Sequence, residues 1–303
     1  MTRSLSRLSP AVLLIVACAL WGAATVLNKA LLTSIPPVTL LALQLAPSAL
    51  ALWTTALLSR AAIRSRPTLI AALLLLGVLN PGISYTLSLL GLARISASVS
   101  TLLWAAEPLM ILGLAALVLR EPVTWRLLVV MLVGGVGVLI VTDIGGGLVD
   151  SRNDPIGILL LLSAVLCCAF YTVISRKLSD RADPLLTVAL QQTAGLVWTS
   201  SLLLANTSYG SVNDLGTISW GLLSAAAVSG LLYYAAAYWL YITALRSVSA
   251  AVAGTYFNII PVFGIGLACA FLGERLAPVQ WAGAGAIMVS TIELVRLTRI
   301  MAR

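Results

Sequence analysis

The chain has 303 residues, of which 60% are hydrophobic and only 9% are charged. A soluble domain carries roughly 25% charged residues and about 45–50% apolar ones, so this composition excludes a soluble globular protein of this length. The net charge of +8 comes from basic residues that stand singly between apolar runs, which is typical of membrane topology signals rather than of a nucleic-acid-binding surface. The composition therefore predicts an all-α integral membrane protein in a lipid bilayer, with no nucleic-acid partner.

Ten apolar runs are long enough to cross a bilayer, because a spanning helix needs about 20 mostly apolar residues. Proline opens several of them, which suits the first helical turn, where the missing N–H has no partner inside the helix. The expected spans cover residues 10–32, 36–58, 67–90, 95–119, 123–142, 155–178, 184–205, 218–243, 248–272 and 278–297.

The N-terminus resembles a secretory signal or a lipoprotein cleavage site, because Arg3 and Arg7 precede an apolar run that contains Cys18. The apolar run continues through Leu32, which is long enough to span a membrane. We therefore expect this segment to be the first spanning helix.

The basic residues predict the orientation, since cytoplasmic loops are enriched in Lys and Arg. If the N-terminus is cytoplasmic, fourteen of the 18 basic residues fall on the cytoplasmic side. The other four are Lys29, Arg94, Arg152 and Arg275. Both termini are then expected in the cytoplasm, which an even number of spans satisfies.

The two halves of the sequence resemble each other. Residues 37–44 (PVTLLALQ) resemble residues 184–191 (PLLTVALQ), with an offset of 147 residues. Further along, Pro108 is matched by Pro261 at an offset of 153 residues, and Glu121 is matched by Glu274 at the same offset. Repetition at a fixed offset indicates two structural repeats.

Each repeat would contain five helices, with the first at residues 1–145 and the second at residues 153–303. Because five is odd, the second repeat would enter the membrane in the opposite orientation. The expected fold is thus ten transmembrane helices in a five-plus-five inverted-topology repeat, an architecture that places a substrate site near the midplane between the halves.

Several motifs resemble the EamA domain of the drug/metabolite transporter superfamily, over nearly the whole chain. They are ALWG around Trp21, EP at residues 107–108, LREPVT at residues 119–124, RSVSAA from Arg246 and FLGERLAPVQWAG at residues 271–283. The resemblance implies ten helices in the cell (inner) membrane and export of metabolites. Within the family, the chain is most similar to the aromatic amino acid exporters.

Glu107 is the acid predicted to lie deepest in the membrane, near the centre of the fourth run. An ionisable residue at this depth is energetically expensive, which favours a functional role. One interpretation is a proton- or cation-responsive group that lines a cavity. The other is a structural hydrogen bond to backbone groups that Pro108 leaves free. The second half has Ile260 at the matching position.

Asn80-Pro81-Gly82 interrupts the third run, because proline removes a backbone hydrogen bond and glycine loosens a helix. Unwound backbone there could contact a substrate, or the interruption could be a packing kink. Asn258, three residues before Pro261, is the parallel candidate in the second half.

Aromatic residues within the spans could form an amphipathic wall for a planar substrate. The interfacial belt of Trp and Tyr is the alternative, and we expect Trp239 and Tyr241 to belong to it. The candidates for the wall are Trp21, Tyr85, Trp104, Tyr171, Tyr234, Tyr238 and Tyr256.

Other polar and small residues are expected to be structural. Gln44 and Gln191 would hydrogen-bond across the bundle or contact substrate, with bundle packing favoured. Glu121 and Glu274 would pair with nearby arginines. The glycines of residues 134–137 and 283–285 would allow close helix packing, within one chain or in a dimer.

These features together predict a secondary transporter that exports a small organic metabolite by alternating access. An aromatic or large neutral amino acid is the first candidate, and drugs, cations or nucleosides are the alternative. With no histidine and no cysteine cluster, we expect neither an enzyme nor a metal or other cofactor. An intramembrane enzyme and a channel are the more distant alternatives. The oligomeric state stays open, and a monomer is compatible with the sequence.

Overall fold

The computed structural model describes residues 9–59, 67–119, 124–142, 154–178, 181–205, 208–216, 218–248, 253, 256–257 and 259–301. The regular elements within these ranges are all helices. The first part of the chain forms α2 (Pro10–Leu31), α3 (Pro37–Leu58), α4 (Pro67–Gly77), η1 (Val78–Ile83), α5 (Ser84–Leu92), α6 (Ala97–Trp104), α7 (Glu107–Leu119) and α8 (Trp125–Thr142).

The second part contains the same kinds of element. It forms α9 (Pro155–Leu178), α10 (Pro184–Leu204), η2 (Val212–Gly216), α11 (Trp220–Gly230), η3 (Leu231–Ala237), α12 (Tyr238–Leu245), α14 (Ile259–Leu267), η4 (Ala268–Leu272) and α15 (Pro278–Met301).

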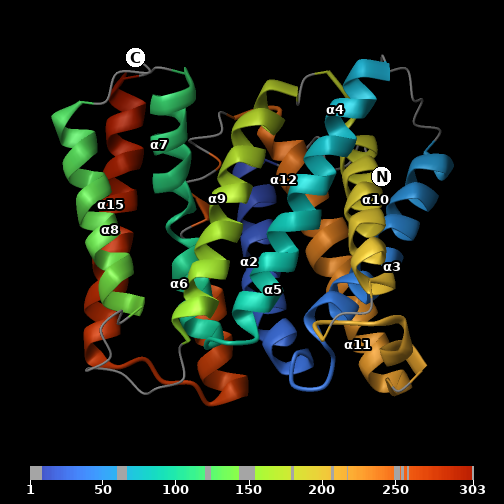
Figure 1. Ribbon diagram of the computed structural model, residues 1–303. Coiled ribbons are helices and arrows are strands. Elements are labelled where there is room, and N and C mark those ends of the chain that lie inside the picture. The colour runs from blue at the N-terminus through green and yellow to red at the C-terminus, as the bar shows by residue number, and fades with distance from the viewer. Residues whose placement is uncertain are drawn as a thin grey trace.

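The helices form a bundle whose axes run from one end of the molecule to the other (Figure 1). At one edge α8 packs along α15, and toward the other edge α3 packs along α10. Between these pairs, α2 contacts α14 and α12, while α9 contacts α5 and α7. The main apolar core lies among these central helices, and the candidate site lies inside it.

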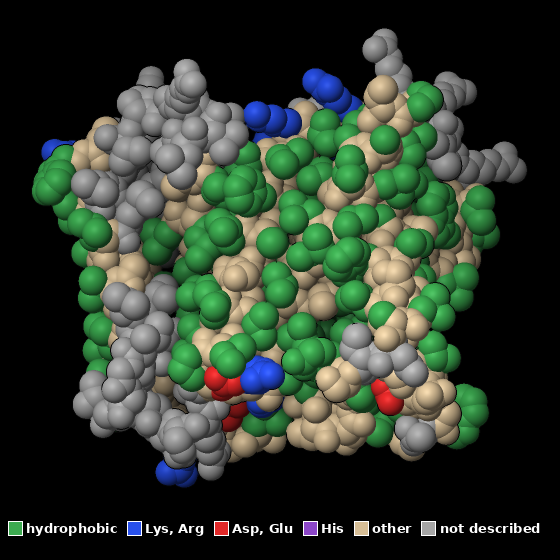
Figure 2. All heavy atoms as spheres, viewed as in Figure 1, with side chains coloured by type: hydrophobic (Ala, Val, Ile, Leu, Met, Phe, Trp, Pro, Cys, Tyr) green, Lys and Arg blue, Asp and Glu red, His purple; other side chains and the backbone are tan. Residues whose placement is uncertain are grey.

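The surface matches a lipid environment. Within the described part of the chain, five helical segments are long and apolar enough to cross a membrane, and two shorter apolar segments accompany them. Hydrophobic side chains cover the middle of the face in Figure 2, and the charged side chains visible there lie toward its two ends. Large apolar side chains such as Leu50 and Leu57 point outward. This distribution is expected where lipid replaces water as the solvent.

The third expected span is two helices that meet at a kink, because η1 between α4 and α5 contains a residue with non-helical backbone angles. Pro81 lacks an N–H, and Asn80 has non-helical backbone angles (φ −145°, ψ 115°). The predicted interruption is therefore confirmed. The eighth expected span also contains a π-helical segment, η3, which lies between α11 and α12, and no proline marks it in the sequence.

Two glycines just before these π segments allow close contacts between helices. A Cβ on Gly77 would lie 2.5 Å from the carbonyl oxygen of Gln191. A Cβ on Gly230 would collide with the backbone of Gln44. Thus α4 contacts α10 in the same way that α11 contacts α3, and both contacts involve the glutamines of the repeated sequence motif.

The fourth expected span is broken, contrary to the single run predicted from the sequence. Helix α6 ends at Trp104, and α7 begins at Glu107 after a turn at Ala105 and Ala106. Pro108 occupies the second position of α7, where a missing N–H leaves no hydrogen bond unmade. Glu107 therefore lies in the first turn of a helix and not in the middle of one.

Glu274 binds a helix N-terminus instead of a neighbouring arginine, so that prediction is wrong. Its carboxylate accepts hydrogen bonds of 2.8 Å from the backbone N–H groups of Ala97 and Ser98, and one of 2.6 Å from the Ser98 hydroxyl. A carboxylate at this position satisfies free N–H groups and interacts favourably with the helix dipole. Glu121 lies outside the described residues.

Charged residues form further contacts at the same end of the molecule. The Lys29 ammonium donates to the carbonyl of Leu92 at 2.9 Å, so Lys29 reaches the end of the bundle as expected for a snorkelling side chain. Arg94 forms a salt bridge of 2.7 Å with Asp154, just before α9.

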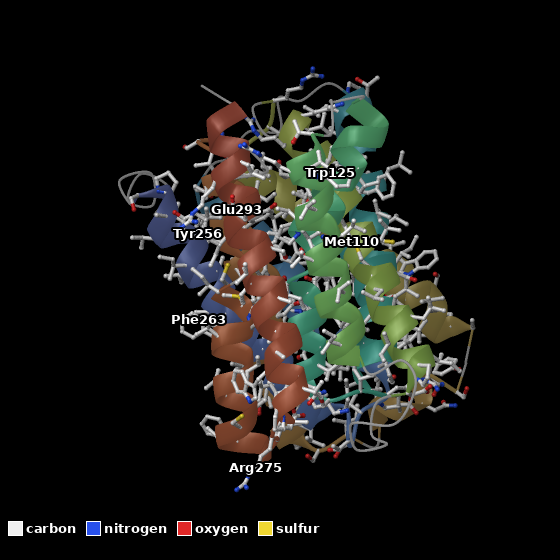
Figure 3. All side chains as sticks on the ribbon, turned by 90° about the vertical axis from the view of Figure 1, so that its left-hand side faces the viewer. Met110, Trp125, Tyr256, Phe263, Arg275 and Glu293 are labelled. Atoms are coloured by element: carbon white, nitrogen blue, oxygen red, sulfur yellow. The ribbon has the colours of Figure 1, made fainter. Side chains whose placement is uncertain are left out.

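The predicted small-residue packing between α8 and α15 is confirmed within one chain. A Cβ on Gly137 would lie 2.8 Å from the carbonyl oxygen of Gly283. The two helices run in opposite directions: Trp125, which begins α8, and Glu293, late in α15, lie toward one end, whereas Arg275 points away from the bundle at the other (Figure 3).

Candidate functional site

A cavity lies within the central helices. Together with its opening to the outside it contains about 420 Å³ of space that no atom fills. Aromatic side chains dominate the wall. The lining residues are Trp21, Thr25, Asn80, Tyr85, Trp104, Glu107, Cys168, Tyr171, Thr172, Tyr233, Tyr238, Tyr241, Phe257 and Ile260.

The two irregular segments η1 and η3, with the helices that follow them, supply four of these residues. Asn80 lies at the kink within η1 and Tyr85 lies in α5 just after it, and both line the cavity. In a π-helix the hydrogen bonds join residues five apart, so side chains at that spacing share a face. Tyr233 and Tyr238 have this spacing across η3, and both also line the cavity.

Trp21 is surrounded by aromatic rings from two other segments. Its ring is perpendicular or steeply inclined to those of Tyr238 and Tyr241, with centroids 5.3 and 5.5 Å away. The ring of Phe257 lies 5.7 Å away in a similar arrangement. On another side of the cavity, Tyr85 stacks on Trp104 with centroids 5.9 Å apart. Such pairs hold rigid ring surfaces around a ligand site.

A chain of hydrogen bonds joins the polar groups of α5 and α12. The hydroxyl of Tyr238 donates to the hydroxyl of Tyr85 at 2.8 Å and accepts from the Asn80 amide nitrogen at 3.0 Å. The Asn80 amide oxygen in turn accepts from Ser84 at 2.7 Å. Asn80 is therefore both part of the helix interruption and part of the cavity wall.

Glu107 lines the cavity with 5% of its surface exposed. Among the described residues, its one hydrogen-bond partner is Thr172, whose hydroxyl lies 3.3 Å from Oε1. That distance is long for a hydroxyl–carboxylate bond, which is about 2.5–2.7 Å when strong. Thr172 also lies 3.3 Å from the Tyr241 hydroxyl, so it links the acid to the aromatic wall.

The lining residues are related by the offsets of the sequence repeat. Twelve of the fourteen described lining residues form pairs separated by 147 or 153 residues. Each half of the chain contributes one member of every pair. The pairs are Trp21 with Cys168, Thr25 with Thr172, Asn80 with Tyr233, Tyr85 with Tyr238, Trp104 with Phe257, and Glu107 with Ile260.

Two buried polar clusters lie beside the cavity. In one, the Gln44 amide donates to Asn28 at 2.6 Å and to Ser229 at 2.9 Å. In the other, the Tyr171 hydroxyl donates to the Gln191 amide oxygen at 2.8 Å. Both glutamines therefore make the cross-bundle contacts predicted from their repeated position.

Seven of the predicted site residues line the cavity: Trp21, Asn80, Tyr85, Trp104, Glu107, Tyr171 and Tyr238. Tyr234 is fully buried but does not line it, and its hydroxyl has no hydrogen-bond partner in the described part of the chain. Tyr256 is half-buried and packs against the core without lining the cavity. Asn258 lies outside the described residues.

Tyr241 shows where the sequence interpretation was wrong. It was assigned to the interfacial belt, but it is 1% exposed and lines the cavity. Its spacing of three residues from Tyr238 is a signal that could have placed both on one helical face. The sequence interpretation also missed Thr25, Cys168, Thr172, Tyr233, Phe257 and Ile260. Several of these were accessible by applying the repeat offset to residues already chosen.

The described residues include no group of three or more His, Cys, Asp or Glu side chains arranged to hold a metal ion. What the cavity offers is ring surfaces, hydroxyls, an amide and one carboxylic acid. These groups can bind an organic solute through its apolar body and through hydrogen bonds.

Comparison with known proteins agrees with this description. The model of the EamA-like transporter family matches the chain twice, at residues 8–143 and 155–296. A Bacillus subtilis (strain 168) protein described as "Uncharacterized transporter YvbV" is 27% identical over 297 residues, which cover 95% of this chain and 92% of the relative. A solved structure described as "Crystal structure of protein" is similar with a TM-score of 0.67 and 17% identity, over 96% of this chain and 99% of the other. That likeness shows the fold alone.

Proposed function

The chain belongs to the EamA-like transporter family, and we propose that it is a secondary transporter that exports a small organic solute through the aromatic cavity. The observation that carries the proposal is the position of the cavity, which is enclosed by spanning helices of both halves of the chain. Transporters with repeated halves bind substrate between those halves, near the middle of the membrane.

An aromatic or large neutral amino acid is the solute class proposed first. The stacked pair Tyr85–Trp104 and the rings around Trp21 present flat apolar surfaces to a planar side chain. The Asn80 amide and the tyrosine hydroxyls can orient the polar end of such a solute. Drugs, cations and nucleosides of similar size are the alternative, and Glu107 is the observation that favours a cation among them.

The proposed architecture is ten spanning helices in two repeats of opposite orientation, with both termini cytoplasmic in the cell (inner) membrane. The paired lining residues support it, as do the matching contacts of Gly77 with Gln191 and of Gly230 with Gln44. The proposed topology places Lys29, Arg94 and Glu274 on the same side of the membrane. Their contact partners, which are Leu92, Asp154 and Ala97 respectively, belong to segments that the topology assigns to that side as well.

Alternating access would use the irregular segments as bending points. The π-helical η1 and η3 and the turn between α6 and α7 adjoin the cavity, and each lacks part of the regular hydrogen-bond ladder. The regular helices α8 and α15, which pack together at the edge of the bundle, would serve as support.

Flux into liposomes that contain the purified protein tests this function. Labelled aromatic and large neutral amino acids are compared with and without a pH gradient. Trp104→Ala should change the ranking of solutes, because Trp104 lines the cavity, whereas Trp220→Ala should not, because Trp220 is 87% exposed on the outer surface. Absence of saturable flux for every amino acid would overturn the solute class. An equal loss for all solutes in Trp104→Ala would argue against its role in the cavity wall.

A further inference from the structure

In the described part of the chain, Glu107 has no salt-bridge partner. No lysine or arginine lines the cavity among the described residues. The titratable side chains that interact electrostatically with Glu107 are cysteines and tyrosines. They are Cys18 of α2, Cys168 and Tyr171 of α9, Tyr233 of η3 and Tyr241 of α12. Cysteine and tyrosine are uncharged at neutral pH in their ordinary state. Lys29, although on α2, donates to Leu92 at the end of the bundle instead.

A carboxylate in such a place needs a positive partner. The thiols, hydroxyls and rings around it cannot neutralise its charge, and the single bond from Thr172 is long. Burial of an uncompensated charge is costly, so the group either takes up a proton or pairs with a cation. The cavity is the route by which either can reach it.

The walls of the cavity suit an organic cation. The face of an aromatic ring carries partial negative charge, and a cation within about 6 Å of the ring centroid is attracted to it. Trp21, Tyr241 and Phe257 lie within 6 Å of one another by ring centroids and line the same cavity as Glu107. Thr172 connects the acid directly to Tyr241.

We propose that Glu107 is the counterion for a protonated amine of the solute, and that the cavity prefers an aromatic monocation to the amino acid with the same side chain. The inference rests on the proposed transport function, and it favours the cationic alternative over the amino acid that was proposed first. A monocation bound at Glu107 leaves the cavity neutral. A zwitterionic amino acid adds no net charge, so its carboxylate leaves the site with one uncompensated negative charge.

The same charge balance makes a proton and the amine alternative partners of Glu107. A proton that binds the carboxylate removes the attraction for the solute, and a solute that binds keeps the proton away. Affinity for the monocation should therefore fall as the pH is lowered, because the proton competes for the same oxygen atoms. A solute that does not use the carboxylate would show no such competition.

The experiment is calorimetric titration of the purified protein in detergent with phenethylamine and with phenylalanine, which differ by the carboxylate. We expect phenethylamine to bind about tenfold or more tightly, a difference of ~1.4 kcal/mol. Glu107→Gln should remove that preference. Glu293→Gln is the matched control, because Glu293 lies on α15, pairs with Arg296 and does not line the cavity. It should behave as the wild type.

Equal affinity for the two ligands, no binding of phenethylamine, or an unchanged preference in Glu107→Gln would each overturn the inference. If Glu107→Gln does not fold, calorimetric titration of the wild-type protein at a series of pH values from roughly 8 down to 5 decides the matter. Affinity for phenethylamine that does not fall toward low pH would overturn it. Liposome flux distinguishes this inference from the proposed transport function. Saturable phenylalanine flux without a preference for the amine would support transport and contradict the inference. Glu107-dependent binding of the amine without flux of any solute would support the inference and contradict transport.

Discussion

The phenolic hydroxyl of Tyr238 donates a hydrogen bond of 2.8 Å to the hydroxyl of Tyr85, 153 residues earlier in the chain. That separation is the offset of the sequence repeat, so matching residues of the two halves meet inside the cavity. Their helices, α5 and α12, come from opposite halves of the chain, and the bond joins them directly.

A double-mutant cycle on this pair measures the strength of that connection. Tyr85→Phe and Tyr238→Phe should each lower the free energy of unfolding, and the coupling between them should be about 0.5–1.5 kcal/mol, the usual net value of a buried hydrogen bond. Thermal unfolding in detergent provides the measurement. Tyr234→Phe is the control, because its hydroxyl has no described partner, and its stability should be unchanged or higher. Additive effects of the two single changes would contradict a direct bond.

Gly77→Ala and Gly230→Ala should each destabilise the protein by about 1–3 kcal/mol, because the added methyl group collides with the backbone of a neighbouring helix. The control is Gly285→Ala, where a Cβ meets nothing within 4 Å. Melting temperatures of the three variants decide the question. A normal melting temperature for both Gly77→Ala and Gly230→Ala would show that the helices do not approach so closely.

Glu274→Ala should lower the free energy of unfolding by about 1–3 kcal/mol, since it leaves two backbone N–H groups and one hydroxyl of α6 without their acceptor. Glu274→Gln keeps an acceptor oxygen but loses the charge, so its effect should be smaller. Unfolding of these variants is compared with Glu293→Ala, which removes an exposed partner of Arg296. An equal effect of Glu274→Ala and Glu293→Ala would argue against the helix-capping role.

The salt bridge between Arg94 and Asp154 predicts a dependence of stability on pH. Its hydrogen bond holds the pKa of the Asp154 carboxyl below its ordinary range. Because the folded-state pKa is the lower one, the stabilisation is complete above the unfolded value of about 4 and is lost as the pH falls through the folded value. The stability difference between wild type and Asp154→Asn should therefore be constant from about pH 5 to 8 and shrink at lower pH. A difference that changes near neutral pH would point to another group.

Reporter fusions test the ten-helix topology. A reporter placed after Asp150 should lie outside the cytoplasm, and one after Arg303 should lie inside it, because the proposed topology places five spans between the two points. Paired reporters that are active on only one side of the membrane make the assignment. Activity of both fusions on the same side would exclude two repeats of opposite orientation.

The sequence by itself determined the membrane character, the approximate positions of the apolar helical segments and the repeat offsets. Few charges and long apolar runs leave helices as the way to satisfy the backbone in lipid, so these conclusions need no tertiary information. The pattern also selected seven residues that line the cavity, because it singled out ionisable, amide and aromatic side chains deep within the apolar runs.

Only the tertiary structure decided which of two adjacent residues of the same type faces the cavity. Tyr233 lines it and Tyr234 does not, because the wide π turn of η3 aligns residues five apart and brings Tyr233, not Tyr234, onto the face of Tyr238. No proline marks that turn. Hydropathy likewise does not reveal where a helix breaks, so Glu107 was expected in the middle of a helix and is found at the start of α7. Both features depend on how whole helices pack together, since packing sets the helical register that spacing in the sequence can only approximate.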